Sequence, residues 1–231
     1  MARGGWIDAT GSKKTRRRVL VWDLPTRLFH WSVVGLVAAA YATWRLDWMG
    51  WHAWIGDALL TLVLWRLLWG ICGSESARFV RFLAPPAAAV RHLAHLFRRE
   101  PDRHAGHNPA GGWMVVVLLA LLLVQTVSGI YVDNDVADVG PLTEMMPAPF
   151  DNAMTALHAL AWDALLAAVA LHVLAIAVYA AAKRHNLLGP MITGYKALPP
   201  DVPEPRPAGP ARALSALAAA AAAAAALSIY L

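Results

Sequence analysis

The sequence predicts an all-α integral membrane protein whose helices pack as a bundle. Of its 231 residues, 58% are hydrophobic and only 15% are charged, and the mean hydropathy is +0.47. These values exclude an ordinary soluble globular protein. The single cysteine, Cys72, excludes a disulfide scaffold and a cysteine-ligated metal cluster, so any bound metal would have to rely on histidine.

Five apolar stretches are candidates for helices that cross the membrane. A helix needs about 20 mostly apolar residues to cross a hydrocarbon core about 30 Å thick. The second stretch is interrupted by Asp57 and Arg66, and the only charged residue of the fourth stretch is Asp163. The fifth is mostly alanine, which inserts only marginally on transfer scales. The stretches cover residues 28–44, 52–72, 113–132, 153–182 and 213–231.

These stretches divide the chain into four parts. Residues 1–27 form a basic N-terminal segment, and residues 28–196 form a transmembrane four-helix domain. Residues 197–211 form a proline-rich linker. Residues 212–231 then form an alanine-rich fifth transmembrane helix.

The distribution of charge predicts how the chain is oriented in the membrane. If the N-terminus is cytoplasmic, 18 of the 20 lysines and arginines fall in cytoplasmic segments, as the positive-inside rule requires. The basic excess then needs no nucleic acid, because basic flanks of helices contact anionic lipid headgroups. The loop between the third and fourth stretches lies on the opposite side and holds only acidic charges: Asp133, Asp135, Asp138, Glu144 and Asp151. A group of tryptophans around the short outer turn is expected at the membrane interface: Trp44, Trp48, Trp51 and Trp54.

Four of the nine histidines lie within or at the ends of the apolar stretches: His30, His52, His158 and His172. A charged side chain at the centre of a membrane costs about 2.5 kcal/mol or more, so each of them is a candidate functional residue. His158 and His172 are 14 residues apart on one helix, which brings them to within about 40° of the same face and separates them by about 21 Å.

The predicted topology pairs these histidines at two depths. His30 and His172 lie near the cytoplasmic side, and His52 and His158 lie near the outer side. Two imidazoles from facing helices are what a bis-histidine haem iron requires. Two such haems would form an electron path across the membrane. With both axial positions filled, neither iron would have an open site for oxygen, and we expect no catalytic residues.

The other ionisable residues carry less specific signals. Arg66 follows His52 by 14 residues, so it could pair with a buried haem propionate or extend to the lipid headgroups, and both readings stay open. For Asp57 and Asp163, hydrogen bonds between helices are favoured over proton transfer. A second metal site in the basic connection is disfavoured against solvated side chains; its histidines are His92, His95, His104 and His107.

Several motifs resemble one family of membrane cytochromes. Residues 21–31 (VWDLPTRLFHW) resemble the opening of bacterial cytochrome b561 and of the b-type cytochrome subunit of nickel–iron hydrogenases. Residues 106–112 (GHNPAGG), Ser128–Gly129, and residues 186–188 and 191–194 are similar to the patterns of that family. The resemblance covers roughly residues 19–196. It implies two haems b held by histidines at the positions of His30, His52, His158 and His172.

The resemblance also implies a role in bacterial respiration. We expect a di-haem cytochrome of the inner membrane that carries electrons between the quinone pool and a periplasmic redox partner, as the electron-transfer subunit of a quinone-linked oxidoreductase. That partner would be a hydrogenase or a c-type cytochrome, and the acidic outer loop would suit a basic cytochrome. A homodimer is compatible with this function. The alternatives are a small histidine-lined transporter of protons or metal ions, which would be colourless, and a purely structural anchor subunit.

Overall fold

The computed structural model describes residues 6–7, 13–14, 16–96, 98, 102–132 and 146–230. Most of the predicted acidic outer loop, including Asp133, Asp135, Asp138 and Glu144, lies outside these residues. Arg3 and Arg99, two of the 18 basic residues predicted to be cytoplasmic, lie outside them as well.

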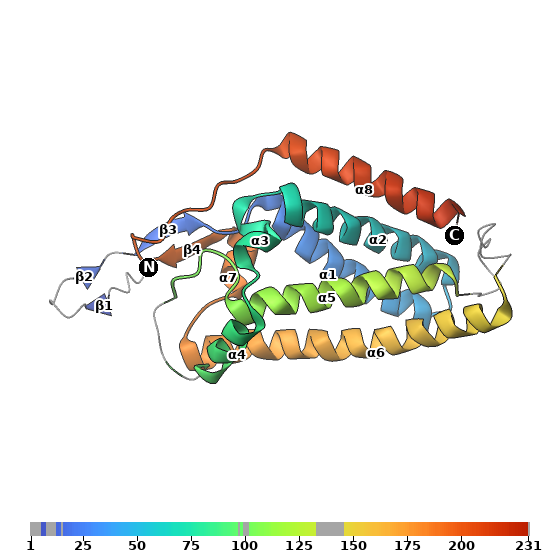
Figure 1. The fold of residues 1–231 in the computed structure, drawn as a ribbon, viewed down its shortest axis with the longest axis horizontal. Coiled ribbons are helices and arrows are strands. Elements are labelled where there is room, and N and C mark those ends of the chain that lie inside the picture. The colour runs from blue at the N-terminus through green and yellow to red at the C-terminus, as the bar shows by residue number, and fades with distance from the viewer. Residues whose placement is uncertain are drawn as a thin grey trace.

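Four long helices lie side by side and form the bundle (Figure 1). They are α1 (Leu24–Arg45), α2 (Met49–Cys72), α5 (Pro109–Ile130) and α6 (Ala148–Val178). Helix α2 packs against α1 and α5, and α5 packs against α6. The predicted all-α membrane bundle is therefore confirmed. Helix α6 begins at Ala148, five residues before the predicted start.

Two of the motifs that resemble the cytochrome family, residues 21–31 and 106–112, contain the beginnings of helices α1 and α5. The side chain of Asp23 accepts a hydrogen bond from the backbone N–H of Thr26 at 2.7 Å and caps α1. The side chain of Asn108 likewise accepts from Gly111 N–H at 2.8 Å and caps α5. A proline in the first turn of each helix has no N–H to leave unsatisfied. Both caps help to define where the bundle helices begin.

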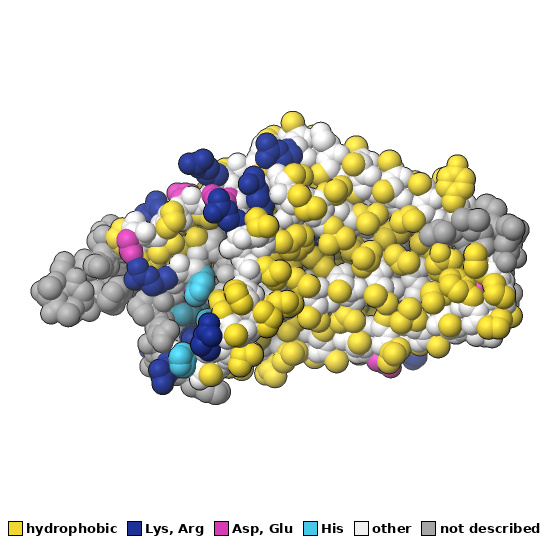
Figure 2. Space-filling model, viewed as in Figure 1, with side chains coloured by type: hydrophobic (Ala, Val, Ile, Leu, Met, Phe, Trp, Pro, Cys, Tyr) yellow, Lys and Arg dark blue, Asp and Glu magenta, His cyan; other side chains and the backbone are white. Residues whose placement is uncertain are grey.

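Four helices of the described residues are long and apolar enough to cross a membrane, by length and composition: Met49–Cys72, Pro109–Ile130, Ala148–Lys183 and Pro210–Tyr230. The third includes the π-helical turn η2 (Tyr179–Lys183). Helix α1 is as long as α5 but less apolar, because it carries polar and aromatic side chains such as His30, Trp31 and Arg45. Hydrophobic side chains cover the visible flank of the bundle (Figure 2). The chain is thus a multi-pass membrane protein.

Lysines and arginines gather at the end of the bundle where α1 begins and α2 ends (Figure 2). We call this end, which includes Arg78, Arg81 and Lys183, the basic end. The short elements between α2 and α5 and after α6 lie here (Figure 1). They are η1 (Glu75–Ala77), α3 (Phe79–Phe82), α4 (Pro86–Ala94) and α7 (Leu188–Thr193).

A small sheet at the basic end ties the beginning of the bundle to its end. Strand β3 (Arg17–Leu20) pairs antiparallel with β4 (Tyr195–Leu198), with Val19 opposite Lys196. Val19 and Leu198 are fully buried there, together with Val21 and Trp22. Neither strand was predicted from the sequence. Their pairing links the segment before α1 to the segment after α6. Two further two-residue strands, β1 (Trp6–Ile7) and β2 (Lys13–Lys14), pair with each other.

Helix α8 (Pro210–Tyr230) lies along the outer side of α2 (Figure 1). Its buried residues, Ala216, Ala220 and Ala224, recur every four positions and so form one face. Ala216 and Ala220 pack in one cluster with Trp65 and Trp69 of α2. These small side chains let the two helices approach closely.

Polar contacts at each end of α8 reinforce its packing on α2. The indole Nε1 of Trp65 donates to the carbonyl of Ala213 at 3.1 Å. The hydroxyl of Ser228 donates to Oδ1 of Asp57 at 2.6 Å, which confirms the interhelical hydrogen bond expected for Asp57. In a membrane such bonds matter because no water replaces them.

We expect Ala220→Leu to loosen α8 from α2. Ala220 is 1% exposed, and inserting a larger side chain into a packed contact costs about 1–3 kcal/mol. The midpoint of thermal unfolding in detergent should fall, and protease should cleave the linker at residues 199–209 faster. Ala222 is exposed, so the control variant Ala222→Leu should behave like the wild type in both measurements. Equal cleavage of the two variants would contradict this packing.

Candidate functional site

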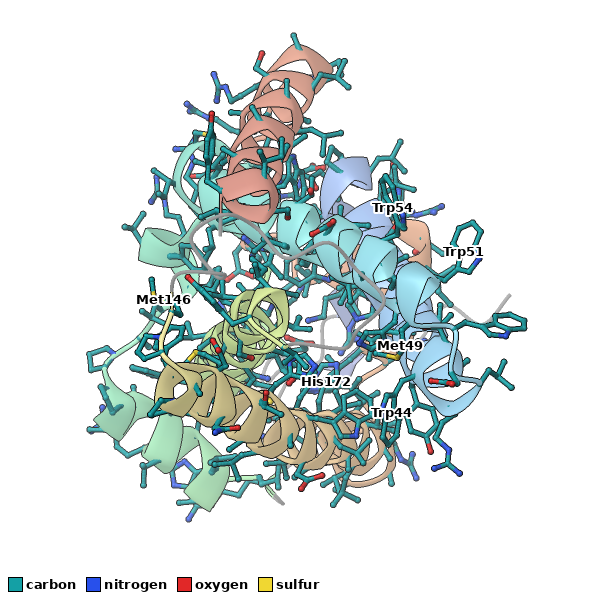
Figure 3. The ribbon with its side chains drawn as sticks, turned by 90° about the vertical axis from the view of Figure 1, so that its right-hand side faces the viewer. Trp44, Met49, Trp51, Trp54, Met146 and His172 are labelled. Carbon is teal, nitrogen blue, oxygen red and sulfur yellow. The ribbon has the colours of Figure 1, made fainter. Side chains whose placement is uncertain are left out.

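The four histidines of the apolar stretches lie at two ends of the bundle. His30 on α1 and His172 on α6 lie toward the basic end, whereas His52 on α2 and His158 on α6 lie toward the opposite end. All four are partly buried. Figure 3 shows His172 among the helices, while Trp51 and Trp54 point outward from α2. The arrangement agrees with the predicted pairing by depth.

The rings of His52 and His158 lie next to each other, edge to face. Their ring centroids are 6.4 Å apart and the ring planes differ by 77°. Two imidazoles that bind one metal ion from opposite sides, with metal–nitrogen bonds of about 2 Å, have ring centres about 6 Å apart. The separation of this pair therefore fits a single metal ion with two axial imidazoles.

Hydrogen bonds orient both rings of this pair. Nδ1 of His52 is 2.9 Å from the carbonyl oxygen of Ala40, and Nδ1 of His158 is 2.9 Å from that of Gln125. A carbonyl only accepts, so each Nδ1 carries the hydrogen and each Nε2 keeps its lone pair. In His158 that lone pair accepts from the side-chain amide of Gln125 at 2.9 Å. The Nε2 atoms are thus suited to bind a metal.

Gly129 on α5 makes room for the ring of His158. A Cβ at this position would lie 2.9 Å from Cε1 and 3.2 Å from Nδ1 of His158. Any larger residue would therefore push the imidazole away from α5. Ser128 lies beside it, with its hydroxyl oxygen 3.3 Å from Nδ1. The sequence analysis noted this Ser–Gly pair only as a family-like motif.

The second pair lies closer to the basic end. His30 lies in the second turn of α1, and His172 lies less than two turns before the end of α6. Nδ1 of His30 is buried and has no hydrogen-bond partner. The rings of His30 and Trp31 are arranged edge to face, with their centroids 4.9 Å apart. The indole N–H of Trp31 donates a hydrogen bond to the carbonyl oxygen of Met191 at 3.2 Å. The pair thus retains an unsatisfied polar atom that the opposite pair lacks.

Arg66 lies on α2 near the basic end and is almost completely buried. It is 3% exposed, its guanidinium lies 5.3 Å from the ring centroid of Phe79, and Nη1 has no partner. An extended side chain reaching the lipid headgroups would be exposed at its tip. That reading of Arg66 is therefore wrong, and the side chain points into the protein.

An apolar layer separates the two histidine pairs. Val63, Leu122 and Leu165, from α2, α5 and α6, are buried together in one cluster. Leu165 lies midway between His158 and His172 along α6. Tyr41 of α1 stacks on Trp162 of α6 at 5.6 Å.

Two histidines of the basic connection are not simply solvated. Nε2 of His92 is 2.7 Å from the hydroxyl of Tyr179. The ring of His107 packs between Trp22 and Phe82, with centroids 4.6 Å away on each side. The prediction of solvated side chains is therefore wrong for these two, and it is consistent with the exposed side chains of His95 and His104. Sequence spacing carried no signal for the difference, because the partners come from distant segments.

A polar pocket opens beside Tyr179 at the basic end. It is lined by His92, Asp102, His104, Asn108, Tyr179, Lys183, His185 and Leu187. Nζ of Lys196 lies 2.5 Å from Oδ2 of Asp102. Burial raises the pKa of Asp102, but hydrogen bonds from His104 and the charge of Lys196 outweigh it and hold that pKa well below the usual range.

Within the described residues, no group of three or more histidine, cysteine or acidic side chains could hold a metal ion. A bis-histidine haem needs only two protein ligands, because the porphyrin supplies the others. The paired imidazoles, the glycine beside one of them and the unpartnered guanidinium of Arg66 fit such a group.

The comparisons with known proteins identify one family. A family model described as prokaryotic cytochrome b561 matches residues 21–194. A search of the curated proteins and a search of the solved structures each find no match to the chain. The matched residues include all four histidines and end before α8.

Proposed function

The chain belongs to the prokaryotic cytochrome b561 family, and from this premise we propose that it is a di-haem cytochrome linking the quinone pool to a periplasmic redox partner. Family membership and its apolar helices make it a membrane b-type cytochrome that binds haem and transfers electrons. The proposal adds the number of haems, their ligands and the partners.

The observation that carries the proposal is the geometry of His52 and His158. We assign these residues to one haem and His30 and His172 to the other, with Arg66 as a further cofactor-binding residue. Each haem supplies an iron that gains or loses one electron. The 14-residue spacing on α6 corresponds to about 21 Å along the helix, so one helix would hold both groups at different depths.

The chain's own residues prepare the site for electron transfer. The carbonyls of Ala40 and Gln125 hold two imidazoles in the orientation that presents Nε2. The apolar layer around Leu165, with Val63 and Leu122, is buried at the depth between the pairs. A conduit for protons or zinc would need polar groups at this depth. The layer therefore favours electron transfer over the transporter alternative.

The polar pocket beside Tyr179 is the best candidate for the quinone headgroup. Tyr179 follows His172 by seven residues, which is two helical turns, so it lies on the same face about 10 Å along α6. The hydroxyl of Tyr179 and the side chains of His92 and Asn108 could donate to quinone carbonyls or accept from quinol hydroxyls. We propose that quinone or quinol exchanges electrons here with the haem of His30 and His172.

The outer partner is proposed on the family resemblance. A hydrogenase or a c-type cytochrome would exchange electrons at the end opposite to the basic end. The positive-inside rule puts that end in the periplasm and the N-terminus in the cytoplasm of a bacterial inner membrane.

We expect two b haems per wild-type chain. His158→Ala and His172→Ala should each lose about one haem, because one axial ligand is removed from a different iron in each variant. A pyridine haemochrome count and reduced-minus-oxidised spectra of the purified protein measure this. The exposed His95 provides the control variant His95→Ala, which should keep both haems. A colourless wild type from haem-replete cells would support the transporter alternative instead.

We expect Gly129→Ala to weaken the haem held by His158. The new methyl group forces the ring to move and strains its hydrogen bond to Gln125. Losing such an orienting bond typically costs about 10- to 100-fold in metal affinity. The rate of haem transfer to a soluble haem scavenger should rise for one of the two haems. Gly35→Ala, where a Cβ would meet nothing within 4 Å, serves as the control, and equal rates would contradict the assignment.

We expect Tyr179→Phe to weaken quinol binding. It removes a hydroxyl from the proposed headgroup site, and one hydrogen bond contributes about 0.5–1.5 kcal/mol, or about a 2- to 12-fold rise in KM. The measurement is the rate of haem reduction by a short-chain quinol at varied concentration. Haem content should stay at the wild-type level. The exposed Tyr230 gives the control Tyr230→Phe, and an unchanged KM in Tyr179→Phe would move the quinone site elsewhere.

A further inference from the structure

Buried polar atoms without a partner concentrate at the basic end of the bundle. Most of those in the described residues lie where α1 begins, where α2 ends or just before α5. They are Oδ2 of Asp23, Oγ1 of Thr26, Nε of Arg27, Nδ1 of His30, Nη1 of Arg66, Nε1 of Trp69 and Nδ1 of His107. A buried polar atom left unsatisfied costs about 1–3 kcal/mol. Such a concentration indicates a polar ligand, and most of the atoms are donors.

Arg66 is the strongest of these donors. A buried guanidinium is always charged and needs an anionic partner. The described residues place no carboxylate within 4 Å of it, so it forms no ion pair. The nearest acidic influence is Asp23, whose Oδ1 already caps α1 by accepting from Thr26. Arg66 therefore has the charge and the free N–H to hold an anion.

His107 provides a donor of a different kind. Its Nδ1 is sealed from solvent and its ring is held between Trp22 and Phe82. Burial, and then the positive charges of Arg66 and Lys196, lower the pKa of His107 to about 3. The imidazole is therefore neutral at pH 7 and can donate one N–H.

The two donors belong to one region. Phe79 lies under the guanidinium of Arg66 and its ring is 5.7 Å from that of Phe82, which in turn packs on His107. Arg66 on α2 and His172 on α6 both lie toward the basic end. A ligand that reaches both donors therefore lies at the basic end, which is also the end of the pair His30 and His172.

We propose that Arg66 and His107 form a carboxylate-binding site for the propionates of the haem at the basic end, with Arg66 as the cation and His107 as a neutral hydrogen-bond donor. The inference rests on the proposed function, because it needs a haem between His30 and His172. A charge-assisted bond from Arg66 is stronger than a neutral one. Together the two donors keep the propionates ionised and fix the rotation of the haem about its axis.

The site should also control the reduction potential of this haem. A positive charge near an iron favours the reduced form, which carries one positive charge fewer. Donors to a carboxylate also lower its pKa, so that it stays ionised through the neutral range. Without them, the propionates would take up a proton near neutral pH, and the potential would change with pH there.

The test is a redox titration of the two haems, followed by absorbance, at several pH values. In Arg66→Gln and His107→Phe, the potential of the haem that His172→Ala removes should become dependent on pH in the neutral range. In Arg66→Gln it should also be lower at alkaline pH. The other haem should titrate as in the wild type. Arg66→Lys keeps the charge and His107→Gln keeps an N–H, so both should restore most of the wild-type profile.

The controls separate this site from simple packing. Phenylalanine preserves the ring between Trp22 and Phe82, and His95→Phe makes the same change at an exposed position of the same connection. If His107→Phe loses a haem that His107→Gln retains, the donor role is supported. Loss of the haem in both variants would overturn the donor role, because His107→Gln keeps an N–H and would then not retain the haem.

Failure of the inference and failure of the proposed function give different results. A wild type without haem would reject the proposed function before any titration. A wild type with two haems whose potentials do not change in Arg66→Gln or His107→Phe at any pH would reject only the carboxylate site. Arg66 would then be paired with Asp23 through water.

Discussion

The bundle depends on satisfying polar groups in a medium that offers them no water. The bonds from His52 to Ala40 and from His158 to Gln125 are the clearest case. Each joins two helices, α2 to α1 and α6 to α5, and each also fixes the tautomer of an imidazole. The same hydrogen bonds therefore pack the helices and orient the nitrogens that we propose as haem ligands. Gly129 makes the bond of His158 possible, because only a residue without a side chain lets His158 approach α5 this closely.

The two ends of the bundle differ in how well this requirement is met. At the end near His52, the side chains of His52 and His158 donate hydrogen bonds to backbone carbonyls of the chain. At the basic end Arg66 and His107 are buried with unsatisfied donors. Buried polar atoms without a partner in the chain occur at functional sites, where a bound ligand supplies the hydrogen-bond partner. The contrast links the two proposals, because a haem would bring both its iron and its carboxylates to the same end.

Helix α8 adds to the family bundle without altering its site. It lies beyond the residues that the family model matches and packs on the face of α2 that carries Trp65 and Trp69. The histidines face the other helices. Because α8 covers this side of α2, the side chains of Trp65 and Trp69 are buried.

The sequence by itself determined the membrane class, the main helices and the four histidines at two depths, because apolar length and helical spacing are properties of single segments. It also carried the motifs of the family. The tertiary structure alone decided the partners of those segments: the β3–β4 pairing, the burial of His107, the contact of His92 with Tyr179 and the need for glycine at position 129. Such contacts join residues far apart in the chain, and no periodicity within one segment encodes what another segment will place beside it.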